Sequence, residues 1–148
     1  MRYSLLFLSC CLIAPISGFA QLPPSQECYL IREMARTTAG FRALGVAKQQ
    51  ILDDMQAVRY EVLSPEWSQR MVAEAYELID EVYAYGAIEP TVYGGYREGL
   101  CLILRSGGEL EVPFEEAYLD LLTCGRLESE VERRECGKGV ADSYASAA

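Results

Sequence analysis

Histidine is missing from this chain, tryptophan occurs once, and basic residues are scarce, with 13 Lys and Arg against 22 Asp and Glu. Without histidine, Ser-His and Cys-His catalytic arrangements are excluded, as is the usual general base near neutral pH. The formal net charge of −9 argues against nucleic acid and against anionic membrane surfaces, both of which require basic patches. A basic protein partner is compatible with this charge, although charge alone also keeps an exported protein in solution.

Long apolar runs are also rare, and the longest one, at residues 5–14, is too short to cross a bilayer. Arg2 precedes this run and Pro15 interrupts it. Gly18 and Ala20 then place small residues at the −3 and −1 positions of a cleavage site. This order of charge, apolar run and small residues is typical of a secretory signal.

We therefore predict a signal peptide at residues 1–20 and a mature protein that begins at Gln21. Arg2 is the only charge removed, so 12 basic and 22 acidic residues remain, a net charge of −10. An uncleaved anchor and a lipoprotein acylated at Cys10 are the alternatives. Since no second apolar run is long enough to span a membrane, we expect no stable membrane association after cleavage.

Four cysteines remain in the mature chain: Cys28, Cys101, Cys124 and Cys136. An even number in an exported domain indicates two disulfides, for which three connectivities are possible. We favour Cys28–Cys101 and Cys124–Cys136, because the second pair flanks a short polar segment and the first joins the opening helix to a distant one. No CxxC pair or histidine is present, so we expect no metal site, no redox-active dithiol and no cofactor.

Apolar residues recur at helical spacing through most of the mature chain, which predicts an all-α fold. Ser64-Pro65-Glu66 is a start signal for the clearest helix, whereas three glycines between 94 and 99 weaken the helix after Pro90. We predict a disulfide-stapled bundle of four to six helices that forms a single domain at 21–137, followed by a flexible tail at 138–148. The expected helices are 27–43, 47–60, 64–85, one that begins near 90, 113–124 and a short charged one near 128–135.

A pattern of residues between positions 28 and 101 resembles small exported bacterial helical proteins of unknown function. Its members here are Cys28, Arg42-Ala43-Leu44-Gly45, Val82-Tyr83, Tyr96 and Cys101. The resemblance implies a helical fold, a bacterial periplasm and a Cys28–Cys101 bridge, but it implies no activity.

The most unusual stretch of the sequence combines glycine with tyrosine at Tyr93, Gly94, Gly95, Tyr96 and Arg97. One interpretation is an interaction loop, because tyrosine and arginine are enriched at interface hot spots. The other, which we favour, is that the glycines let two helices pack closely while the tyrosines fill the space. The lysine and hydroxyl residue of a phosphate-binding loop are missing.

Tyrosines also cluster between the third and fourth expected helices, where Tyr76, Tyr83 and Tyr96 are candidates for an aromatic ligand pocket. The competing interpretation is packing, since Tyr76 and Tyr83 already belong to the apolar stripe of their helix.

Carboxylates are abundant enough to offer the pairs that glycoside hydrolysis requires, but most fall on polar helix faces, where solvation explains them. Size, export, acidity and disulfides favour a non-enzymatic periplasmic or secreted interaction protein, one form of which is an immunity or inhibitor protein with a basic exported partner. A small-ligand carrier with a tyrosine-lined pocket is the second hypothesis, and a carboxylate-dependent hydrolase of cell-wall material is the third. The oligomeric state is not specified by the sequence.

Overall fold

The computed structural model describes residues 23–62, 66–110 and 114–146, and within these ranges it contains six α-helices and two two-residue strands. The all-α prediction is thereby confirmed, while the expected signal peptide lies outside the described residues. Among the described helices, none is both long and apolar enough to cross a membrane. The elements are α1 Pro24–Ala43, α2 Lys48–Val62, α3 Glu66–Ala84, α4 Pro90–Arg105, β1 Glu109–Leu110, α5 Phe114–Cys124, α6 Glu130–Ser143 and β2 Ala145–Ser146.

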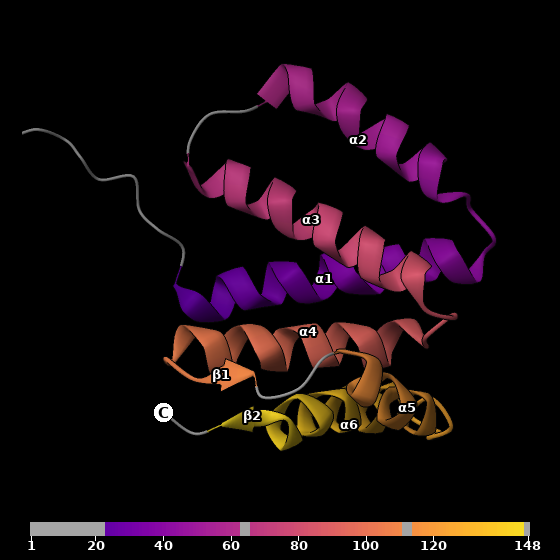
Figure 1. Ribbon diagram of the computed structural model, residues 1–148, viewed down its shortest axis with the longest axis vertical. Coiled ribbons are helices and arrows are strands. Elements are labelled where there is room, and N and C mark those ends of the chain that lie inside the picture. The colour runs from indigo at the N-terminus through magenta and orange to yellow at the C-terminus, as the bar shows by residue number, and fades with distance from the viewer. Residues whose placement is uncertain (1–22, 63–65, 111–113, 147–148) are drawn as a thin grey trace, which may run out of the picture.

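Helix α4 occupies the centre of the molecule, with α1 on one side and α6 on the other (Figure 1). Helix α3 lies across α1, α5 lies beside α6, and α2 is at the edge of the molecule. The main core is formed by the faces that meet around α4, because its apolar side chains are buried by neighbours on both sides. Its fully buried large side chains include Tyr93, Leu78, Leu121, Val82 and Val92.

Glycine allows α4 to approach both of its neighbours closely. A Cβ atom at Gly95 would overlap the backbone oxygen of Arg134 in α6, and one at Gly94 would lie 3.1 Å from the backbone oxygen of Arg32 in α1. Gly137 of α6 allows the same close approach from the other side, since a Cβ atom there would overlap the backbone oxygen of Val92 in α4. The glycines that weaken the intrinsic helix propensity of this segment are therefore the residues that let three backbones meet.

Two disulfides hold these helices, with the pairing that the sequence analysis favoured. Cys28–Cys101 joins α1 to α4 with a Cα–Cα distance of 5.4 Å, and Cys124–Cys136 joins α5 to α6 at 5.6 Å. Both distances are ordinary for disulfide-bonded cysteines. Disulfide-bonded cysteines are consistent with an extracytoplasmic protein.

The predicted flexible tail at 138–148 is wrong for the residues that the structure describes. A capping box between Ser129 and Glu132 begins α6, and the helix then continues to Ser143. Val140 and Ala141 are buried, and β2 pairs with β1 in antiparallel orientation. Small residues in this segment are a requirement of close packing against α4, whereas the sequence analysis interpreted them as a sign of fraying.

Candidate functional site

The glycine-tyrosine stretch is part of α4 and is not a surface loop. Tyr93, Tyr96 and Arg97 retain 0%, 2% and 8% of their exposure, and Gly94 and Gly95 are buried against α1 and α6. The interaction-loop interpretation is therefore wrong, and the packing interpretation is confirmed. The charged residue of this stretch is Arg97, and a buried arginine requires hydrogen-bond or ion-pair partners.

Arg97 finds these partners on α3. One terminal nitrogen donates to Glu74 and the other lies 3.4 Å from both carboxylate oxygens of Glu81. The hydroxyl of Tyr93 donates to the same Glu81 carboxylate at 2.7 Å. The guanidinium of Arg97 thus links two acidic side chains of α3 to α4. A planar, permanently charged guanidinium is well suited to bind two carboxylates at once.

The burial of this network changes its ionisation. Burial raises the pKa of the Glu81 carboxyl, and the nearby Arg97 charge and the Tyr93 hydroxyl only partly oppose that rise. The pKa of Tyr93 is raised well above its usual value, first by burial and then by the Glu81 charge. Burial together with the Glu81 charge raises the pKa of Tyr96 to about 12. Both tyrosines therefore stay neutral at physiological pH.

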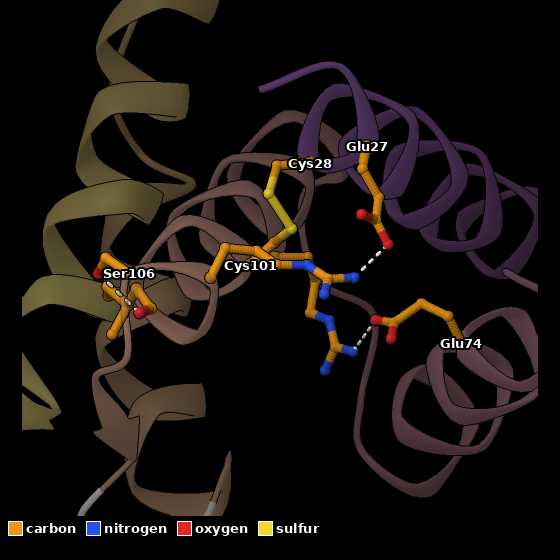
Figure 2. The surroundings of a disulfide bond; sticks show 8 residues. Glu27, Cys28, Glu74, Cys101 and Ser106 are labelled. Carbon is orange, nitrogen blue, oxygen red and sulfur yellow. Dashed lines mark hydrogen bonds and ion pairs between the residues drawn. A yellow bond between two sulfur atoms is a disulfide. The ribbon is translucent and has the colours of Figure 1, made fainter. Parts of the chain in front are cut away.

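A hollow of about 410 Å³ opens beside the Cys28–Cys101 disulfide, between α1, α3 and α4. We call it the disulfide-side hollow. Figure 2 shows Glu27 and Glu74 on the same side of the disulfide, each carboxylate joined to a guanidinium group, that of Arg105 for Glu27 and that of Arg97 for Glu74. Its lining combines apolar and charged side chains: Ile31, Glu74, Glu77, Arg97, Leu100, Cys101, Leu104 and Arg105.

A smaller hollow of about 120 Å³ lies between α1, the start of α4 and the start of α6. Arg32, Arg36 and Arg134 line it together with Glu33 and Glu130. Arg32 is already paired with Glu33 at 2.9 Å, and Arg134 is paired with a carboxylate of its own helix.

The three tyrosines proposed as a pocket do not converge on either hollow. The hydroxyl of Tyr83 donates to the backbone oxygen of Val46, and the Tyr83 ring lies under the guanidinium of Arg42 at 5.2 Å. Tyr96 instead packs against Phe114, with the ring centroids 5.6 Å apart. Neither of these two hollows is therefore the expected tyrosine-lined pocket, since the Tyr83 ring faces the α1–α2 junction and the Tyr96 ring fills the core beside α5.

Charge is distributed unequally between the interior and the surface. In the described part of the chain, seven cations form ion pairs: Arg32, Lys48, Arg97, Arg105, Arg133, Arg134 and Lys138. Exposed carboxylates without an ion pair in the described part of the chain include Asp53, Asp54, Glu77, Glu115, Glu116, Glu128, Glu130 and Asp142. Most of the described positive charges are thus neutralised by ion pairs, while many of the described carboxylates face solvent without one.

The arrangement supplies binding groups more readily than a catalytic pair. Glu74 and Glu77 both line the disulfide-side hollow, but they come from the same helix and so do not face each other across it. The carboxyl with the raised pKa, that of Glu81, is not among the lining residues. Within residues 23–62, 66–110 and 114–146, no group of three or more potential ligands is placed to hold a metal ion.

The sequence analysis missed the network of Arg97 with Glu74 and Glu81. One signal was present, because Glu74 and Glu81 are seven residues apart and so share a side of α3 with the fully buried Leu78. No family model, no curated protein and no solved structure matches the chain. The resemblance to small exported bacterial helical proteins therefore stays a prediction, and function is argued from the side chains themselves.

Proposed function

We propose that this chain is a non-enzymatic, periplasmic interaction protein of the inhibitor or immunity type, which binds a basic exported protein. The observation that carries this proposal is the unequal pairing of charge: in the described part of the chain most cations are held in ion pairs, whereas many carboxylates are exposed and have no ion pair. An acidic surface of this kind accelerates encounter with a basic partner and disfavours acidic ones. The disulfides and the expected signal peptide support export.

The surface best suited to the partner is the outer face of α5, made of Glu115, Glu116, Leu119 and Leu122. Helical spacing places these residues opposite the buried side, which carries Ala117 and Leu121. Leu119 is 67% exposed and Leu122 is 38% exposed, and both carboxylates face solvent. Exposed apolar groups bordered by charge are typical of protein-binding surfaces, and the negative border favours a partner with Lys or Arg around an apolar contact.

The test begins with capture of partners from a periplasmic extract on oxidised mature protein. The captured protein is then purified, and its affinity is measured by calorimetry at two salt concentrations. We expect a basic partner whose affinity falls with salt, and falls at least about tenfold in the variant Glu115→Gln/Glu116→Gln. Asp53→Asn/Asp54→Asn is the matched control, because it removes the same charge from exposed positions on α2.

Three outcomes decide the proposal. Loss of affinity in the α5 variant alone supports a specific surface on α5. Equal losses in both variants would show that net charge acts at long range and would reject this location. A captured protein that is acidic, or whose binding ignores salt, would reject the proposed partner class.

A further inference from the structure

The disulfide-side hollow has the size and the mixed lining of a small-molecule site. Its volume of about 410 Å³ falls within the range of such sites, and its walls differ in character. Ile31, Leu100 and Leu104 provide an apolar wall beside the disulfide, whereas Glu74 and Glu77 stand on α3. We propose that this hollow binds a small amphipathic amine, with its ammonium at the α3 carboxylates and its apolar part against the α1–α4 wall.

The charge around the hollow selects the sign of the ligand. The two lining guanidinium groups, of Arg97 and Arg105, are joined by ion pairs to Glu27, Glu74 and Glu81, and Glu77 lines the hollow as well. Two positive groups against four carboxylates leave a formal charge of −2. The balance stays negative even when Glu81 carries a proton. A cation is therefore attracted and an anion repelled.

Glu77 is the group most available to an ammonium. Its side chain is exposed, and it makes no hydrogen bond or ion pair in the described part of the chain. Glu74 lies one helical turn earlier on the same side of α3, so both carboxylates border the same space. A primary ammonium has three donors, which suits two neighbouring carboxylates.

Arg97 positions one of the two carboxylates. Its side chain is nine-tenths buried and lines the hollow, and its Nε is the one guanidinium nitrogen that has no hydrogen-bond partner. This nitrogen has almost no accessible surface, so the contribution of Arg97 to the hollow is the ion pair that holds Glu74 beside it. The ligand class that fits this lining is thus a small amine with a short apolar chain.

Leucinamide, a primary amine with a short apolar chain, is the probe, and binding is followed by calorimetry and by NMR titration of the oxidised mature protein. The measurement is made near pH 6, where an α-amino group with a pKa of about 8 is protonated. Two comparison probes each change one group: N-acetyl-leucinamide lacks the ammonium, and leucine adds a carboxylate. We expect saturable binding of leucinamide and at least about tenfold weaker binding of both comparison probes.

Variants at exposed lining positions test the location without endangering the fold. Glu77→Gln should weaken leucinamide binding about tenfold, and Leu104→Ala, at a side chain 51% exposed, should weaken it about threefold to tenfold. Glu128→Gln, at an exposed position between α5 and α6 that does not line the hollow, is the charge-matched control and should leave the affinity unchanged. Circular dichroism confirms that each variant is folded.

The proposal is overturned if leucinamide shows no saturable binding, if N-acetyl-leucinamide binds equally well, or if Glu77→Gln leaves the affinity unaltered. Tighter binding of leucine than of leucinamide would also overturn it, because it would show that Arg97 and Arg105 select an anion. None of these results depends on the outer face of α5. Failure here therefore leaves the proposed protein partner untouched, and the reverse also holds.

Discussion

The α1–α4–α6 layer and helix α2 have the same secondary structure but are held by different means. In the layer, the glycines at positions 94, 95 and 137 bring backbones into contact, and one disulfide fastens α1 to α4. Helix α2 is joined to the rest by the Lys48–Asp80 ion pair at its start, by the hydrogen bond from Tyr83 to Val46 just before it, and by burial of Ile51. Helical sequence thus determines where helices form, whereas small residues and crosslinks determine which of them form a rigid unit.

Removal of the disulfides should have the largest effect on the packed layer. A bridge mainly restricts the unfolded chain, so its contribution grows with the number of residues enclosed. Cys28–Cys101 spans 73 positions and Cys124–Cys136 spans 12. We expect the double serine variants to lose about 4 and about 3 kcal/mol of unfolding free energy, respectively.

Urea unfolding followed by far-ultraviolet circular dichroism measures both losses on the mature protein. The ratio between the two variants is the informative quantity, because the absolute values depend on the denatured state. A greater loss from the short bridge would contradict the account and would indicate that the α5–α6 pair contributes more to the fold than the α1–α4 pair.

Replacement of a glycine at the contact between α4 and α6 should have the second-largest effect on the unfolding free energy. Gly137→Ala would place a Cβ atom into the backbone oxygen of Val92, so α4 and α6 must separate, at a cost of about 3 kcal/mol. Gly139 is two residues away on the same helix, and a Cβ atom there meets nothing within 4 Å. Gly139→Ala should therefore stabilise the protein by up to about 1 kcal/mol, through helix propensity alone.

Thermal and urea unfolding of this pair of variants separate close packing from helix propensity. Similar changes in the two variants, of either sign, would show that the backbones of α4 and α6 are not in the contact described. Gly95→Ala offers a second probe of the same interface from the side of α4, where the Cβ atom would meet the backbone oxygen of Arg134.

The parts of the fold that could be predicted from sequence depend on local spacing. The helix that follows Ser64-Pro65 and the disulfide between Cys124 and Cys136 are examples, because the signals lie within a few residues of the feature. The continuation of α6 past Gly137 could not be predicted in this way. Its small residues are stabilised by contact with α4, which lies more than thirty positions earlier in the chain.

The candidate site was less accessible to sequence analysis, because it depends on how helices cross. Arg97 had a role only in the interaction-loop interpretation, the less favoured of the two, and Glu74 and Glu81 were interpreted as part of a solvated helix face. Their pairing follows from the way α4 lies against α3, and helical periodicity does not specify which faces of two helices meet. Leu78, an apolar residue at helical spacing between the two carboxylates, was the local signal that could have revealed it.

Alkaline pH should destabilise the protein by ionising the tyrosines buried in the layer, and this is the third-largest effect that we expect. The pKa of Tyr96 is raised to about 12 in the folded protein, above its usual value of about 10 in the unfolded chain. Stability from this group is therefore complete below pH 10 and is lost as pH rises toward 12. Tyr96→Phe should reduce the slope of that loss by about 1 kcal/mol per pH unit.

The measurement is urea unfolding between pH 9 and pH 12, with Tyr29→Phe, at a half-exposed position on α1, as the control. Tyr93 continues to titrate in the Tyr96 variant, so part of the alkaline loss should persist. A profile for Tyr96→Phe that coincides with the wild-type profile would contradict burial of this hydroxyl.

The smallest effect is expected at the attachment of α2. Lys48 and Asp80 lie 2.9 Å apart, but their side chains are 42% and 70% exposed, so removal of the pair should change the unfolding free energy by less than about 0.5 kcal/mol. Hydrogen exchange should be more sensitive than global unfolding, because α2 can open without separating α1, α4 and α6. In Lys48→Ala we expect faster exchange of α2 amides and unchanged exchange in α4. If the amides of α4 also exchanged faster, α2 would belong to the same cooperative unit as the layer, and the distinction between the two regions would not hold.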